Sequence, residues 1–356
     1  MPPIQYLAVY VLVALGYASL FWQGPATFAL PVLVFGLIPV AEHFLPGTKR
    51  NFTPDEEKER LGNPWFDALL FLAIPSLYGV VALLLWRVET GAMTGLSLLG
   101  GVASVGLLIG AIGINVGHEL GHRPGLLHQR ASKALLFTAL YMHFFVEHNR
   151  GHHMRVATDE DPASARRGDW VYGHWVRSIV GGLRSAWSLE ATRLERRGGS
   201  RWSLRNEVLR GLLLEGAAVV AVAALLSPLA AAVWVVCALL GVLTLETVNY
   251  VEHYGLRREA KENGRFERVR PHHSWNSNHT LGRVLLFDLS RHSDHHANPR
   301  RPFPVLRHFD DAPQLPTGYP GMMVLSLFPP LFTSVMEREL SRAEREYFDR
   351  EVPAAA

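Results

Sequence analysis

The sequence predicts an all-α, polytopic membrane protein with about six transmembrane helices and a histidine-rich region on the cytoplasmic side. Of the 356 residues, 49% are hydrophobic and only 19% are charged. The mean hydropathy is +0.10, which is unusually high for a soluble chain of this length. The apolar residues also gather in runs of about 20, the length that crosses a bilayer as a helix. We treat residues 1–356 as one integral-membrane domain.

Six apolar runs have the length of a membrane span, and they cover residues 6–22, 25–41, 66–86, 94–117, 208–226 and 228–248. No Lys or Arg precedes the first run, so we expect a retained span and not a cleaved secretory signal. The fourth run contains Gly106, Gly110, Gly113 and Gly117, a spacing that lets helix backbones approach closely in lipid. A shorter run, 134–146, would reach only about 20 Å as a helix. We interpret it as a re-entrant or interfacial helix.

Lysine and arginine set the orientation, because short cytoplasmic loops hold an excess of both. Lys49, Arg50, Lys58 and Arg60 follow the second run, whereas only Arg87 follows the third. This distribution places the segments 42–65, 118–207 and 249–356 in the cytoplasm.

Charge and cysteine content exclude several classes of protein. The net charge is only +3 and the basic residues are scattered, which argues against a nucleic-acid partner. The single cysteine, Cys237, lies inside an apolar run, so the chain can form no internal disulfide and no cysteine-ligated zinc or iron–sulfur centre. If the chemistry needs electrons, another protein must supply them.

Clustered histidines are the most informative feature of the chain. His118 and His122 stand four residues apart at the end of the fourth run, and this spacing puts both imidazoles on one helix face. With Glu119 they match the H-E-x-x-H pattern of zinc proteases. Seven more imidazoles follow at His148, His152, His153, His253, His292, His295 and His296. Nine imidazoles at one membrane boundary are too many for one metal ion and suit two.

The ligand type narrows the choice of metal. Imidazole suits zinc, copper, iron and nickel, and nine neutral ligands without a thiolate make an iron pair the natural candidate. Four carboxylates within the clusters could accept the second ring N–H of a ligating histidine: Glu119, Glu147, Glu252 and Asp294. Four isolated histidines, His43, His128, His174 and His308, are interpreted as ordinary core or surface residues.

Five stretches in order resemble the membrane alkane 1-monooxygenases, within the integral-membrane desaturase and hydroxylase superfamily. They are HELGHR (118–123), EHNRGHH (147–153), NYVEHYGL (249–256), PHHSWNSNH (271–279) and LSRHSDHHA (289–297). General desaturases share the outer boxes but lack NYVEHYGL and PHHSWNSNH, so those two specify the family. Arg123 stands where many members have Lys, which preserves the charge.

The resemblance implies a cofactor of two iron ions and the terminal hydroxylation of medium- or long-chain n-alkanes with dioxygen. Its metal ligands are carried over onto His118, His122, His148, His152, His153, His253, His292, His295 and His296. His272, His273 and His279 fall in a family box that we place next to the site. The alkane would enter from the lipid bilayer between helices, and Val34 and Phe35 are candidates for setting the preferred chain length.

The resemblance also implies an electron donor and a location. The family's donor is rubredoxin, a separate chain here, reduced by rubredoxin reductase. A basic cytoplasmic face could bind that acidic protein, or could simply follow the positive-inside rule; it comprises Arg166, Arg167, Arg193, Arg196, Arg197 and Arg201. We expect the inner membrane of a bacterium, with the active site on its cytoplasmic side.

Two other classes of membrane protein would need polar residues that the apolar runs of this chain largely lack. An intramembrane zinc protease would need a further acidic ligand, and the sixth run contains no Asp. A metal transporter would need polar residues in the middle of its spans, where this chain has few. A related di-iron enzyme acting on fatty acyl chains or alkylarenes differs only in its substrate.

Overall fold

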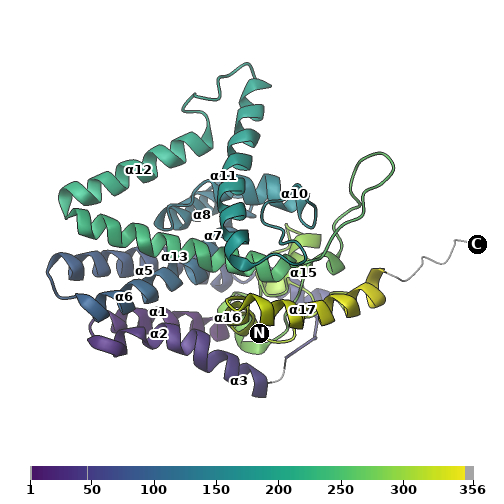
Figure 1. Cartoon of the computed structure of the whole chain (residues 1–356), viewed down its shortest axis with the longest axis horizontal. Coiled ribbons are helices and arrows are strands. Elements are labelled where there is room, and N and C mark those ends of the chain that lie inside the picture. The colour runs from purple at the N-terminus through teal and green to yellow at the C-terminus, as the bar shows by residue number, and fades with distance from the viewer. Residues whose placement is uncertain (1, 46, 349–356) are drawn as a thin grey trace, which may run out of the picture.

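A computed structural model describes residues 2–45 and 47–348. All regular secondary structure among these residues is helical, apart from two isolated bridge pairs, and no strand occurs. The expected all-α class is therefore confirmed. Apolar helices lie side by side along the long axis of the molecule, and the histidine-bearing segments gather at one end of them (Figure 1).

Five helices are long and apolar enough to cross a membrane within the described part of the chain: Gly24–Phe44, Trp65–Glu89, Gly95–Gly121, Glu207–Leu225 and Pro228–His253. The first expected span corresponds to a shorter apolar helix, Pro3–Ser19. Six apolar helices therefore stand where six runs were expected, and the chain is an integral membrane protein.

Several of these helices contain short 3-10 or π segments. The first comprises η1 (Pro3–Leu7) and α1 (Ala8–Ser19). The second comprises η2 (Gly24–Phe28), α2 (Ala29–Val32), the π turn η3 (Leu33–Leu37) and α3 (Ile38–Phe44). The short helix α4 (Pro54–Leu61) precedes the third apolar helix, α5 (Trp65–Glu89). The fourth comprises α6 (Gly95–Leu108), the π turn η4 (Ile109–Ile114) and α7 (Asn115–Gly121).

The last two membrane helices are α12 (Glu207–Leu225) and α13 (Pro228–His253), which are joined by a tight turn. The side chain of Asn206 accepts hydrogen bonds from two backbone N–H groups at the start of α12. The Ser227 hydroxyl accepts one such bond, from the backbone N–H of Ala230 at the start of α13, which has Pro228 at its first position. Both are favoured ways to begin a helix.

The glycines of the fourth run let the Gly95–Gly121 helix approach its neighbours closely, as expected. A Cβ atom on Gly106 would lie 2.7 Å from Leu240 Cβ, and one on Gly110 would lie 2.8 Å from the carbonyl oxygen of Gly241. Gly113 and Gly117 face Leu77 and Leu136 in the same way, with closest atoms at 2.6 and 3.3 Å. Only glycine lets α13, α5 and α8 pack so near this central helix.

The short run 134–146 is not one helix, so the expectation of a single re-entrant or interfacial helix was wrong. Helix α8 (Leu126–Thr138) ends inside the run, and α9 (Phe144–Glu147) starts near its end. Leu140 lies between them with a φ of 50°, a left-handed conformation that a helix cannot contain. The backbone N–H of Met142 donates to Glu215 Oε1 on α12, 2.7 Å away, which holds the connecting loop.

The polar segments cover one end of the bundle. The π turn η5 (His148–His152) and α10 (His153–Arg155) follow α9 directly, and α11 (Val171–Glu195) then runs crosswise to the membrane helices (Figure 1). After α13 come η6 (Pro271–His273), α14 (Thr280–Leu285), α15 (His292–Ala297) and η7 (Phe303–Val305). Helices α16 (Tyr319–Ser326) and α17 (Pro329–Ala343), with η8 (Glu344–Phe348), complete the described chain.

Candidate metal centre

Four separate segments bring the nine clustered histidines together. They are the end of α7 with the residue after it, the η5–α10 segment, the last residue of α13, and α15. The ligand atoms form two groups. The five-histidine group comprises His118, His122, His148, His153 and His295. Two further sets share His253, one with His152 and His296 and one with His292 and Glu252; we call their four imidazoles, His152, His253, His292 and His296, the four-histidine group.

In the five-histidine group, the Nε2 atoms converge. Those of His118 and His295 are 2.7 Å apart. His122, His148 and His153 form a triangle whose edges are 3.0, 3.2 and 2.9 Å. All five ligand atoms lie within 4.8 Å of one another.

The four-histidine group is built around His253. Its ligand atom lies within 4.8 Å of those of His152 and His296, and also of those of His292 and Glu252. Nε2 of His292 is 3.3 Å from that of His253 and 3.1 Å from Glu252 Oε2, and Nε2 of His152 is 3.3 Å from that of His296. Of the four expected carboxylates, Glu252 thus contacts a histidine of these groups, but it does so at the converging Nε2 of His292 and not at a second ring N–H as expected.

The chemistry of these donors fits bound cations. An imidazole Nε2 either carries a hydrogen and donates, or has a lone pair and accepts. Among the three Nε2 atoms of His122, His148 and His153, at least two must therefore both be donors or both be acceptors, and two such atoms repel each other at these distances. A metal ion that accepts all three lone pairs removes this conflict. With metal–nitrogen bonds of about 2.1 Å, two nitrogens bound at a right angle lie about 3.0 Å apart, which agrees with the triangle's edges. The residues therefore fit two transition-metal ions, one in each group.

Burial keeps the imidazoles in the neutral form that binds metal. It lowers the pKa of His148, His153, His292 and His296 well below the usual range, and neighbouring histidines lower it further. The pKa of His295 falls to about 3, again chiefly through burial.

Asp161 supports the site and was missed by the sequence analysis. Its Oδ2 lies 2.9 Å from Nδ1 of His152 and also accepts a hydrogen bond from the Ser164 hydroxyl at 2.6 Å. Although burial opposes ionisation, His152 and these hydrogen bonds lower the pKa of Asp161 to about 2. A carboxylate that accepts the outer ring N–H fixes the tautomer of a metal ligand. Nothing in the spacing of residues 158–162 identified this partner.

The other three expected carboxylates bind arginines. Glu119 pairs with Arg123 at 2.9 Å and accepts from the backbone N–H of Phe303. Glu147 pairs with Arg155 at 2.7 Å. Asp294 accepts hydrogen bonds from both the backbone and the guanidinium of Arg307. These three carboxylates therefore anchor the histidine segments through arginines, and do not accept histidine N–H groups as expected.

The 271–279 box packs against the segments that hold the two histidine groups, but none of its residues belongs to either group. The backbone N–H of Trp275 donates to the carbonyl of Glu252, and the Ser293 hydroxyl of α15 donates to the carbonyl of Ser274. His272 and His273 form a separate group with Glu267, and Nδ1 of His279 is 3.0 Å from the Ser277 hydroxyl. The box therefore positions α15 against the end of α13.

The remaining histidines lie outside both groups. His43 is exposed, His128 contacts Asp67, and His308 contacts Asp310. His174 is buried on α11, as an ordinary core residue would be. His143, for which the sequence predicted no role, is buried in the loop before α9.

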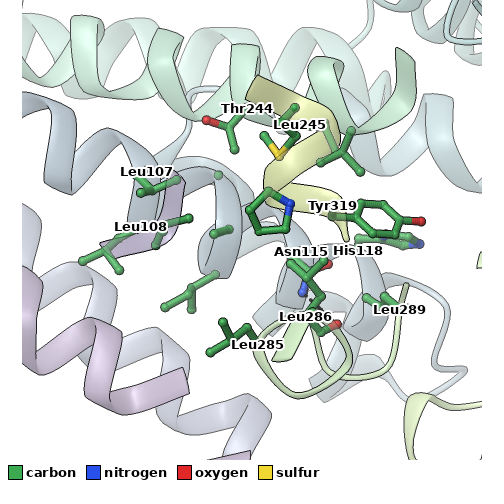
Figure 2. A pocket seen from close by; sticks show the side chains of 18 of the residues that line it. Leu107, Leu108, Asn115, His118, Thr244, Leu245, Leu285, Leu286, Leu289 and Tyr319 are labelled. Carbon is green, nitrogen blue, oxygen red and sulfur yellow. Dashed lines mark hydrogen bonds between the residues drawn. The ribbon is translucent and has the colours of Figure 1, made fainter. Parts of the chain in front are cut away.

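An apolar cavity ends at the histidine groups (Figure 2). Leu107 and Leu108 lie on the side of the cavity away from His118, and Leu285, Leu286 and Leu289 line another wall. The polar part of the lining lies mainly near the two histidine groups. It comprises Asn115, His118, His148, Asn249, Glu252, His292 and Tyr319.

Two π turns border this cavity. Val34 and Phe35 of η3 line it, as do Gly110, Ala111 and Ile112 of η4. A π turn widens a helix locally and is frequent at functional sites. Val34 and Phe35, the candidates for setting the preferred chain length, therefore line an apolar cavity; their effect on chain length stays a prediction.

The basic face is partly neutralised within the chain. Arg167 pairs with Glu337 and Glu344, and Arg193 pairs with Glu190. Arg166 and Arg201 have carboxylate partners at 3.5 and 3.3 Å. Arg196 and Arg197 are exposed at the end of α11, so they are the best candidates of the six for contacting another molecule.

Comparison with known families gives a consistent match. Residues 94–326 match the fatty acid desaturase family. This range begins in the loop before α6 and includes all nine histidines of the two groups.

Individual relatives extend the match over most of the chain. Alkane 1-monooxygenase 1 of Alcanivorax borkumensis is 38% identical over 340 residues, which cover 94% of this chain and 81% of the relative. Alkane 1-monooxygenase of Ectopseudomonas oleovorans is 40% identical over 316 residues, covering 87% and 77%. The hydroxylase component of the xylene/toluene monooxygenase of Pseudomonas putida is 28% identical, covering 100% and 95%.

Proposed function

Because the chain belongs to the membrane alkane 1-monooxygenases of the fatty acid desaturase family, we propose that it converts medium- or long-chain n-alkanes to 1-alkanols. The observation that most strongly supports this is the continuity of the apolar cavity with both histidine groups: His118 and His148 of one group and His292 of the other line it. An alkane that enters from the aliphatic side would present its end to the metal site.

The proposed cofactor is two iron ions, one in each histidine group. When bound, the iron pair would activate dioxygen with two electrons, so that one oxygen atom enters the methyl group and the other leaves as water. An unactivated methyl group has no acidic proton and no polar handle, so side chains alone cannot attack it, and a metal-based oxidant is required.

The protein's own residues orient the substrate and exclude water. Leucine and valine side chains enclose the alkane, and desolvation of its apolar surface supplies the binding energy. A cavity that takes the alkane end-on would bring its terminal carbon to the histidines first, which accounts for terminal selectivity. The lining residues include no Lys or Arg, so the cavity offers no cation for the carboxylate of a fatty acid.

The electron donor is proposed to be rubredoxin, reduced by rubredoxin reductase. The single cysteine is buried in α13, so this chain holds no rubredoxin-type centre of its own. Of the six arginines of the basic face, we propose that the exposed Arg196 and Arg197 contact an acidic donor. We place the histidine groups on the cytoplasmic side of a bacterial inner membrane, where a soluble donor could reach them.

One experiment tests this function. Detergent-purified protein is analysed for iron, zinc, copper and nickel by mass spectrometry, and is then given octane, dioxygen, rubredoxin, rubredoxin reductase and reduced nicotinamide cofactor. We expect two irons per chain and formation of 1-octanol. Zinc in place of iron with no alcohol formed would contradict the proposal, and oxidation of xylene but not octane would assign the chain to alkylarenes.

A further inference from the structure

A second, smaller cavity lies next to the histidine groups, and its lining is polar on several sides. Its volume is about 20 Å³, which is enough for one water molecule. It shares Phe144, His148 and Asn249 with the apolar cavity. His148 of the five-histidine group and His152 of the four-histidine group both line it.

Two polar side chains in this cavity have atoms without a hydrogen-bond partner. His143 is 6% exposed, and neither of its ring nitrogens has a partner. Oε2 of Glu147 is also buried without one. Unsatisfied buried polar atoms are costly and rare in proteins. One water molecule in the cavity would give a partner to one ring nitrogen of His143 and to Oε2 of Glu147, since an ordered buried water makes two to four hydrogen bonds.

A buried carboxyl group, that of Glu246, also lines this small cavity. Glu246 lies in the membrane helix α13, two turns before His253, and is 2% exposed. Tyr141 OH donates to its Oε1 at 3.0 Å, while Asn249 Nδ2, at 3.1 Å, and the Ser178 hydroxyl both donate to its Oε2. An ionisable residue inside a membrane helix is costly, and it is usually retained for a function.

The chemistry of a monooxygenase requires such a polar route. For each methyl group hydroxylated, one C–H bond and the O–O bond break, and a C–O bond forms. The second oxygen atom leaves as water, which takes two electrons from the external donor and two protons from solvent. The apolar cavity is filled by alkane during turnover, so those protons need another path.

We propose that the small cavity holds one water molecule and that this water, together with Glu246 and Tyr141, passes protons to the site of dioxygen reduction between the two histidine groups. This inference rests on the proposed function. The cavity approaches solvent at Glu147, whose Oε1 accepts from Arg155. The Arg155 side chain is 25% exposed.

The first test compares two buried membrane glutamates. Glu246→Gln keeps the size of the side chain and one acceptor oxygen but removes the acid. We expect it to retain iron and to lose alcohol turnover on the order of 100-fold, the usual contribution of a positioned proton donor, with a larger solvent deuterium isotope effect. Glu215→Gln is the control, because Glu215 is also buried in a membrane helix but does not line the cavity.

The second test removes the water and keeps the acid. Gly182 lines the cavity, and a Cβ atom there would meet only Glu147 Cγ, at 3.8 Å. Gly182→Ala should therefore fold, displace the water and slow turnover with the same rise in isotope effect. Gly173→Ala on the same helix is the control, since its added methyl group meets nothing within 4 Å.

A density map of the purified protein that resolves ordered water gives a readout independent of turnover. We expect density bridging His143 and Glu147 in the wild type and in Glu215→Gln, and none in Gly182→Ala. No density in the wild type, or wild-type turnover and isotope effect in Glu246→Gln, would overturn the inference. If Glu246→Gln does not fold, Tyr141→Phe and Gly182→Ala decide it. A wild-type enzyme that binds iron and makes no alcohol would instead refute the proposed function.

Discussion

The Nε2 atoms of His148 and His153 lie 2.9 Å apart, although the two histidines stand five positions apart in the sequence. The π turn η5 explains this contact, because the backbone N–H of His153 donates to the carbonyl of His148. In a regular α-helix, His148 would instead share a face with His152, four residues on. The turn places His152 in the other group, so one short segment supplies ligands to both.

Loss of one ligand from the five-histidine group should remove metal and activity without unfolding the protein. We predict that His295→Ala stays in the membrane but loses iron and alcohol formation, because Nε2 of His295 is one of five nitrogens in that group. Mass spectrometry and the octane assay measure both. His43→Ala serves as the control, since His43 is exposed and lies outside the groups. Full activity in His295→Ala would disprove the ligand assignment.

The Asp161 carboxylate should affect metal binding through its contact with His152. Asp161→Asn weakens the acceptor for the His152 ring N–H, and such changes typically reduce metal affinity by about 10- to 100-fold. Iron retained after a chelator challenge is the measurement. Asp159 stands two residues earlier with its side chain 76% exposed, so Asp159→Asn should behave as the wild type. Equal iron loss in the two variants would contradict a specific role for Asp161.

Close helix packing at Gly110 should be sensitive to one added methyl group. Gly110→Ala places Cβ 2.7 Å from Thr244 Cβ and 2.8 Å from the Gly241 carbonyl oxygen, and such overpacking typically costs about 1–3 kcal/mol. We expect a lower thermal unfolding midpoint in detergent. Gly216→Ala on α12 meets nothing within 4 Å and should show no loss. An unchanged midpoint in Gly110→Ala would mean that η4 and α13 pack less tightly than described.

Filling the aliphatic part of the cavity should shorten the preferred alkane. Val34 lines the cavity and is only partly buried, so Val34→Phe can be accommodated while it occupies space that a longer chain needs. Competition among alkanes of graded length, with products separated by gas chromatography, gives the preference. Val32→Phe is the matched control, because Val32 is 56% exposed and lies on the same helix outside the cavity. A preference shifted equally in both variants would argue against the cavity as the substrate site.

The sequence alone determined the class of the molecule and the residue types of the site. Apolar runs of membrane-spanning length identified the helices, because burial in lipid requires a helix with its backbone hydrogen bonds made internally. The glycines of the fourth run predicted its close packing, and three histidine clusters with His253 indicated a site for two metals. Each of these is a local pattern that does not depend on which segments meet in space.

The tertiary structure decided how the nine histidines divide, because a π turn and the packing of four separate segments set which nitrogens converge. The break at Leu140 also could not be inferred from the run 134–146, since a contact with Glu215 on a distant helix holds that loop. Asp161, His143 and Glu246 acquire their surroundings only through packing: a carboxylate against His152, an unpartnered imidazole, and an acid beside a cavity for one water. Composition and spacing contain no record of such contacts, because burial and the partner of each polar group follow from the complete fold.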